Sequence, residues 1–317
     1  MTSAGVRPVE TVLRDELARA DRALSGLAPV LGHLLVSAGH SMVSDAVVAR
    51  LRGMLNDIAR QLIASLHDQL DLARDGGVDP IDYLSDILAA DPVLVGYLHA
   101  VAIEALITER LEQRASIDPV LSPLWQELIA SSDPQTAEIA MQALAAQSRF
   151  MQAQRRRQHP VSEMPPATFD RVLKILDTPD AAIPATSLEA ARRTLKSDYD
   201  EAQSREGLLA RLVTAMRGGA IAALELDHAG LALFVSVLAD RAGLAREKAV
   251  LACHERQIAR LALSLRAAGL DGDAIERQFL ILEPSKRAPS ELGALPADTA
   301  RALLLQTGFD EREAAAR

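Results

Sequence analysis

Apolar residues recur at steps of three and four positions along most of this 317-residue chain. Between residues 44 and 74 they form one continuous stripe, made of Val47, Leu51, Leu55, Ile58, Leu62, Leu66 and Leu70. This period is typical of an amphipathic helix that buries one face. The segment that starts at Pro92 carries no charge before Glu104 and is apolar on nearly every side. Such a segment predicts a helix in the centre of a bundle.

Helix starts are marked in the sequence by a repeated Asp-Pro pair. A carboxylate before the first turn accepts backbone N–H groups, and the fixed φ of proline suits the first helical position. Four such pairs occur, at Asp79–Pro80, Asp91–Pro92, Asp118–Pro119 and Asp133–Pro134. No segment alternates apolar and polar residues over the length of a strand. The pattern therefore predicts an all-α fold of roughly ten to twelve helices, arranged as a multi-helix bundle or an irregular stack of helix pairs.

One stretch interrupts the helical pattern near the middle of the chain. Residues 155–166 read RRRQHPVSEMPP, a basic helix end followed by three prolines. Because proline stops helices, we expect an N-terminal helical bundle over residues 1–158 and a C-terminal helical domain over 161–317. Three later prolines predict a linker near 283–296, which precedes a last short helix.

The amino-acid composition indicates which residues fill the core and which cellular compartment the protein occupies. Hydrophobic residues make up 49% of the chain but aromatic residues only 3%, so Leu, Ala, Val and Ile must fill the core. The single cysteine, Cys253, excludes an internal disulfide and a multi-cysteine metal site, and it suits a reducing compartment. The N-terminus has no apolar run of signal-peptide length. We therefore expect a cytoplasmic protein.

Charge and hydropathy bear on membranes and nucleic acids. The longest uncharged stretch, residues 23–44, contains a proline, three glycines and two histidines. It predicts a buried helical hairpin rather than a membrane span. The formal net charge of −9 at pH 7 argues against bulk electrostatic binding to nucleic acid or to an anionic membrane. We expect no association with a membrane.

Catalytic and cofactor motifs are missing from the sequence. There is no Gly-x-Ser-x-Gly elbow and no glycine-rich phosphate loop, and Cys253 has no evident base beside it. Glu225 and His228 provide the one Glu-x-x-His spacing, whereas a helical di-metal centre needs two. We therefore expect no catalytic residue, no cofactor and no bound metal, and the sequence does not favour an enzyme.

Two histidines have informative surroundings. His67 precedes Asp68 on the flank of the 44–74 stripe, so a half-exposed ring there is a candidate phosphoacceptor of a phosphorelay, with a plain surface histidine as the alternative. His254 falls on an apolar seam with Leu251, Ile258, Leu261 and Leu265. That seam predicts a histidine in the core or at an interface, satisfied by a hydrogen bond.

Residues 238–249, LADRAGLAREKA, resemble the helix-turn-helix of bacterial regulators. In that motif a small residue (here Ala239) lets two helices cross, a glycine (Gly243) makes the turn, and an apolar residue (Leu244) fills the gap. The match departs from the motif in the second helix, where Ala249 occupies a position that usually carries Val or Ile. A glycine after a helix also ends ordinary helices, so a plain helical corner remains open.

The second helix of this motif presents three basic residues, Arg246, Lys248 and Arg256, as candidate nucleic-acid contacts. Glu247 and Glu255 nearly balance their charge, which weakens any attraction to phosphates.

Four segments carry a resemblance to a known family. They are GLALFVSVLADRAGL (230–244), ACHERQIARLALSLRAAGLDGDAIERQFL (252–280), IASSDPQTAEIAMQALA (129–145) and PPATFDRVLKIL (165–176). Their pattern of apolar and polar residues is similar to that of an uncharacterised family of all-helical alphaproteobacterial proteins, known only as a domain of unknown function. The likeness spans most of residues 60–285. It implies an all-helical fold and a bacterial cytoplasmic setting, and it carries over no functional residue.

These observations favour a non-catalytic helical module for protein interaction or regulation, which binds another protein and forms a homodimer or other homo-oligomer. The mean hydropathy of +0.08 is high for a soluble chain, so we expect some apolar helix faces to stay exposed as interfaces. Two alternatives remain. One is a DNA-binding regulator that uses residues 238–256, and the other is a phosphorelay protein that uses His67.

Overall fold

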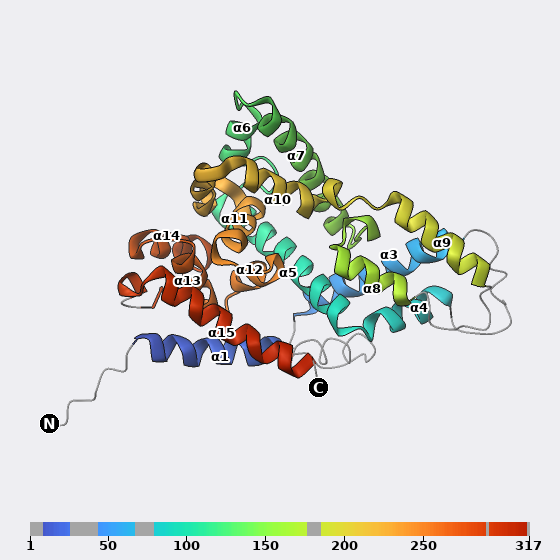
Figure 1. Cartoon of the computed structure of the whole chain (residues 1–317), viewed down its shortest axis with the longest axis horizontal. Coiled ribbons are helices and arrows are strands. Elements are labelled where there is room, and N and C mark those ends of the chain that lie inside the picture. The colour runs from blue at the N-terminus through green and yellow to red at the C-terminus, as the bar shows by residue number, and fades with distance from the viewer. Residues whose placement is uncertain (1–8, 26–43, 67–78, 176–184, 290–291, 316–317) are drawn as a thin grey trace. The chain divides into compact units, whose positions relative to one another are not determined.

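The computed structural model describes residues 9–25, 44–66, 79–175, 185–289 and 292–315 (Figure 1). Within these ranges the chain forms fourteen α-helices and four short 3-10 helices, with no strand. The all-α prediction is therefore confirmed. The helices outnumber the ten to twelve expected partly because the seam from Leu251 to Leu265 is not one helix. It is divided between α12 (Arg246–Ala252) and α13 (Ile258–Ala267).

The chain divides into two compact units, and each is assembled from separate stretches of sequence. The first contains residues 1–26, 106–132 and 213–317, and the second contains 27–105 and 133–212. The division expected between 158 and 161 lies inside the second unit. There the backbone N–H of His159 donates to Asp57 Oδ2, and that of Val161 donates to Gln61 Oε1, at 3.0 and 2.9 Å. The prolines of this stretch thus mark a turn held against a helix, rather than a boundary.

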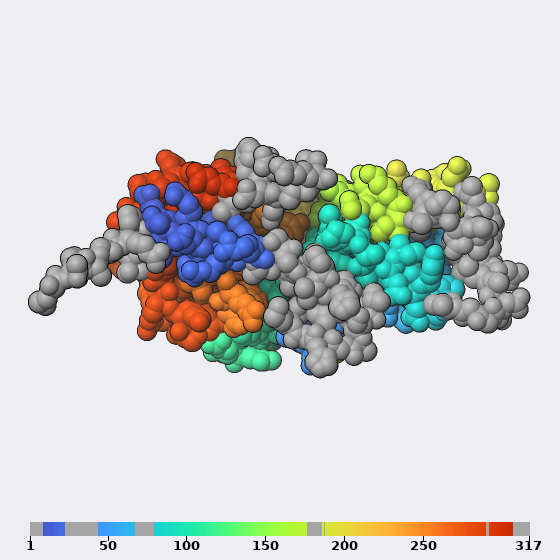
Figure 2. Space-filling model, turned by 90° about the horizontal axis from the view of Figure 1, so that it is seen from below, coloured from blue at the N-terminus to red at the C-terminus, as the bar shows by residue number. Residues whose placement is uncertain are grey.

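The first unit is organised around α11 (Leu226–Ala242) and α13. Most residues of α11 are buried, and it contacts α6 (Pro123–Ile129), η3 (Arg217–Leu224), α12 and α14 (Gly272–Leu282). Helix α13 contacts α1 (Val9–Ser25), α15 (Ala297–Ala315) and η4 (Leu292–Ala294). Figure 2 shows α1, in blue, beside the red α15.

The second unit contains the predicted amphipathic stripe. Helix α3 (Asp45–Ser65) buries all five stripe residues that lie within it, and it contacts α4 (Pro80–Ala89) and α9 (Ala185–Asp198). Helix α4 also contacts α8 (Pro166–Ile175). The remaining elements are α5 (Pro92–Ala115), which contributes residues to both units, α7 (Pro134–Arg155), η1 (Val161–Glu163), η2 (Glu201–Gln203) and α10 (Arg205–Met216).

Three of the four Asp-Pro pairs begin helices as predicted. The carboxylates of Asp79, Asp91 and Asp133 accept backbone N–H groups in the first turns of α4, α5 and α7. The prediction at Asp118 is wrong. Its Oδ1 accepts the N–H groups of Val120 and Leu121 and closes a turn. The next helix, α6, starts only at Pro123.

One glycine adopts a backbone conformation that other residues avoid. Gly230 has φ 71° and ψ 161° and interrupts the first turn of α11, while Ser122 Oγ donates to the carbonyl of Ala229 at 2.7 Å. A Cβ at residue 230 would lie 3.3 Å from the Cβ of Ser122.

We expect Gly230→Ala to lower the free energy of unfolding by about 1–3 kcal/mol, because an L side chain is strained at this φ and ψ. Urea denaturation measures the change. The matched control is Gly96→Ala in α5, where no atom lies within 4 Å of the added Cβ and alanine favours the helix by roughly 0.5–1 kcal/mol. Equal effects of the two substitutions would contradict the assignment of strain to Gly230.

Candidate functional site

The predicted helical corner is present in the first unit. Gly243 follows the last residue of α11 and caps the helix in the left-handed conformation, with φ 70° and ψ 38°. The N–H of Leu244 donates to the carbonyl of Ala239 at 2.9 Å. Helices α11 and α12 bend by 113° at this turn. That bend lies within the range of helix-turn-helix pairs. The local sequence pattern therefore predicted the turn.

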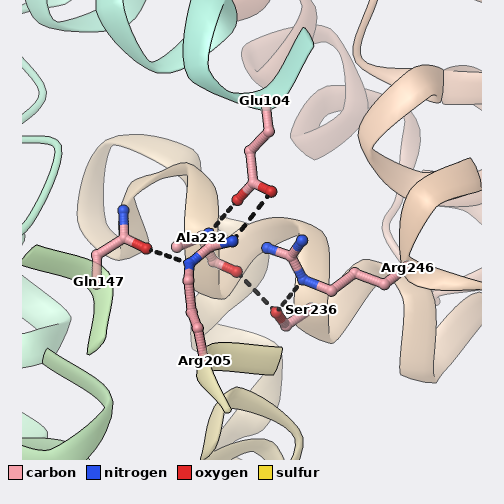
Figure 3. Close-up of polar contacts among 6 residues, drawn as sticks. All are labelled: Glu104, Gln147, Arg205, Ala232, Ser236 and Arg246. Atoms are coloured by element: carbon pink, nitrogen blue, oxygen red, sulfur yellow. Dashed lines mark hydrogen bonds and ion pairs between the residues drawn. The ribbon is translucent and has the colours of Figure 1, made fainter. Parts of the chain in front are cut away.

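The three candidate nucleic-acid contacts do not share one exposed helix face. Helix α12 has only seven residues, and Arg246 at its start is half-buried, with its Nε donating to Ser236 Oγ at 3.2 Å (Figure 3). Lys248 is also half-buried and has an interaction partner. Arg256 is exposed but lies beyond the end of α12, in the turn before α13. Two of the three cations are therefore partly covered, and the third lies outside the helix.

The other residues singled out by sequence are not gathered into a site. His67 lies outside the described residues. The prediction of a helical seam through His254 is wrong, because this half-buried histidine lies in the turn between α12 and α13. Burial lowers its pKa, and its Nδ1 accepts the N–H of Arg256 at 3.3 Å. Cys253 is buried at the end of α12. Across the described ranges, no group of three or more His, Cys, Asp or Glu residues could hold a metal ion.

A buried polar cluster in the second unit, formed by Glu104, Gln147 and Arg205, was not foreseen. The guanidinium of Arg205 contacts both carboxylate oxygens of Glu104, with Nη1 to Oε2 at 3.2 Å and Nη2 to Oε1 (Figure 3). Its Nε donates to Oε1 of Gln147 at 2.7 Å. The side chains of Arg205 and Glu104 are only 4% and 2% exposed. A two-pronged contact of this kind is among the strong hydrogen-bonded ion pairs of proteins.

His159 lies near this cluster and is almost fully buried. Its Nε2 is 3.2 Å from the hydroxyl of Tyr97, and the two rings meet edge to face with centroids 5.4 Å apart. Its carbonyl accepts from Gln61 Nε2 at 3.0 Å, so α3 holds the backbone of this residue on both sides. Burial, and to a smaller extent the charge of Arg205, lowers the pKa of His159 to about 4. The ring is therefore neutral near pH 7.

A pocket of about 70 Å³ adjoins these residues in the second unit. Its apolar walls include Val101, Phe150 and Ala153, and its polar groups include Tyr97, His159 and Arg205. The guanidinium of Arg205 lies over the ring of Phe150, with its Cζ 3.8 Å from the ring centroid. A small apolar pocket with a few convergent polar groups and a shifted pKa is the usual form of a ligand site. We refer to it as the His159 pocket.

Sequence reasoning missed the buried polar cluster beside this pocket because its members come from three distant segments. Glu104, Gln147 and Arg205 are 43 to 101 positions apart, and no motif joins them. One signal was available. Glu104 is the first charge in an otherwise apolar helix, and a charge in a fully buried helix requires a partner from elsewhere in the fold.

Two described segments are long and apolar enough to cross a membrane by length and composition alone. They are α5 and the α10–η3 segment (Arg205–Leu224), each with a mean hydropathy of 1.3 over the most apolar 18 residues. The bent pair of α11 and α12 would pass the same test as one broken span. Burial separates the first two, since 72% of the α5 window is buried in the fold but only 39% of the α10–η3 window.

No protein-family model, curated protein or solved structure matches this chain. The resemblance to an all-helical alphaproteobacterial family therefore stays a prediction.

Proposed function

We propose that the protein is a non-catalytic helical module that binds another protein through the η3 end of the α10–η3 segment. The observation that supports this is the difference in burial between two segments of equal hydropathy. Among the most apolar 18 residues, 72% are buried in α5 but only 39% in the α10–η3 segment, where Ile221 is the one large apolar side chain that is exposed. Apolar surface left in water is unfavourable, so a partner that covers it gains free energy.

The chemistry of the exposed face indicates the kind of partner. Between residues 214 and 224 the exposed residues are Thr214, Arg217, Gly218, Gly219 and Ile221, all in the first unit. Small side chains let a second helix approach closely, and Ile221, which is 50% exposed, offers a larger apolar contact. Arg217 is the one charge between residues 212 and 224. We infer a partner helix that presents a smooth apolar face with an acidic residue at its edge.

A pull-down with matched variants tests this proposal. The tagged full-length chain is incubated with host extract, with and without nuclease. We expect Ile221→Glu to reduce recovery of a stoichiometric partner at least tenfold, because a buried interfacial glutamate has no partner charge. The control is Leu280→Glu, which places the same charge at a similarly exposed position of α14 and should leave recovery unchanged.

Other outcomes would overturn the proposal. Equal recovery with Ile221→Glu and Leu280→Glu would rule out the η3 end as the binding surface. Recovery that is lost with nuclease would favour nucleic-acid binding. Flotation of the chain with phosphatidylcholine vesicles, abolished by Ile221→Glu, would identify lipid as the occupant. Sedimentation velocity of the purified chain distinguishes a second copy from a different protein.

A further inference from the structure

The size of the His159 pocket limits what can enter it. A water molecule needs roughly 10–15 Å³ of such space, so a pocket of about 70 Å³ accepts a molecule of about five to seven non-hydrogen atoms. Single small rings and short chains match that volume, whereas most of a nucleotide, a peptide or a fused-ring cofactor would lie outside the pocket.

The charges around the pocket are already paired. Arg205 is held by Glu104, and Glu163 accepts the backbone N–H of Arg205 at 2.6 Å and lies 4.0 Å from Arg149. Glu206 also has an interaction partner. An ionic ligand would therefore compete with these existing pairs, whereas a neutral ligand leaves them intact. The ligand is expected to be neutral.

The apolar walls of the pocket and its polar groups, Tyr97 and His159, define the rest of the ligand's chemistry. Val101, Phe150, Ala153 and Pro160 provide apolar and aromatic contacts for a flat ring. The Tyr97 hydroxyl and the neutral His159 ring together offer hydrogen-bond donors and acceptors at one side. Tyr97 and His159 already share a hydrogen bond, and the Tyr97 oxygen keeps a lone pair that can accept the proton of a ligand hydroxyl.

From these features we propose that the His159 pocket binds a neutral, monocyclic aromatic compound of the size of phenol, with its ring against Phe150 and its hydroxyl donating to Tyr97, whose own hydroxyl is held by His159. This site is separate from the protein-binding face proposed above and does not depend on it.

Ligand-detected NMR titration of the full-length chain with phenol tests the proposal. We expect saturable binding in about the millimolar range, which corresponds to roughly 4 kcal/mol for seven non-hydrogen atoms. Benzene lacks the hydroxyl and should bind several-fold more weakly. The 1-methylpyridinium ion is a ring of the same size with a permanent charge, and it should not bind saturably.

Two variants locate the binding. Ala153→Phe fills the pocket from α7 and should weaken phenol binding at least tenfold, whereas Ala145→Phe adds the same ring at an exposed position of α7 and should not. Tyr97→Phe keeps the ring and removes the hydroxyl, so it should bring the dissociation constant of phenol close to that of benzene. The proposal is overturned if phenol shows no saturable binding, if Ala153→Phe and Ala145→Phe behave alike, or if 1-methylpyridinium binds as tightly as phenol.

Discussion

Replacing Arg205 with methionine should lower the free energy of unfolding by about 3–5 kcal/mol, because Glu104 would then keep a buried charge and lose the guanidinium that pairs with it. The loss combines the desolvated carboxylate with the hydrogen bond that Gln147 Oε1 accepts from Arg205. The backbone N–H that Arg205 donates to Glu163 is unaffected by the substitution. Urea denaturation monitored by circular dichroism measures the change.

The double variant Glu104→Leu/Arg205→Met distinguishes the net contribution of the ion pair from the cost of removing only one of its two charges. We expect it to recover much of the stability lost in Arg205→Met, because two apolar side chains replace two charges that had to be desolvated. The exposed control is Arg171→Met, which removes a surface partner of Asp91 and should cost about 0–1 kcal/mol. An effect of Arg205→Met no larger than that of Arg171→Met would show that the buried pair contributes little.

Features set by neighbouring residues could be predicted from the sequence. The stripe of α3 follows from a period of three to four residues, and the central place of α5 follows from its lack of early charges. Both are buried as expected, except that Val93 at the start of α5 is 49% exposed. The Asp91 and Asp133 caps require contacts only two or three positions along the chain. The turn at Gly243 belongs to the same class, because its left-handed conformation follows from the residue type.

Features that depend on distant residues could not be predicted. Asp118 satisfies the local rule for a cap, yet the helix starts at Pro123, where Ser122 bonds to the carbonyl of Ala229, 107 positions away. The seam through His254 has a helical period, yet the chain turns between α12 and α13, where Gln257 donates to the carbonyl of Ala20. In each case the local pattern was compatible with two structures, and tertiary contacts select one.

The candidate functional residues also divide into those set by local contacts and those set by distant ones. The helix-turn-helix resemblance predicted the corner correctly, because crossing and turning are local properties of Ala239 and Gly243. DNA contact needs exposed cations on a protruding helix, and that depends on what else packs there. Arg246 instead bonds to Ser236, which belongs to the preceding helix. The His159 pocket shows the reverse, since no local pattern marks it and only the fold brings its members together.

Acidification should destabilise the protein through His159, and the loss should be about 3 kcal/mol between pH 6.5 and 4. The pKa of this histidine is about 4 in the folded protein and 6.5 in the unfolded chain, and that difference corresponds to roughly 3 kcal/mol. Because the folded pKa is the lower one, the unfolded state binds more protons across this window. The stabilisation is complete above pH 6.5 and is lost as the pH falls through the folded pKa.

The test compares the pH dependence of unfolding in the natural chain and in His159→Gln, which cannot titrate. His254 also has a lowered pKa and contributes to the slope in both proteins, so the difference between the two curves isolates His159. We expect His159→Gln to be the less stable protein at pH 7, because glutamine does not reproduce the ring contact with Tyr97, and to lose much less stability on acidification. Parallel curves between pH 6.5 and 4 would mean that His159 is solvated or already charged in the folded protein. That result would also remove the neutral polar corner on which binding of phenol in the His159 pocket depends.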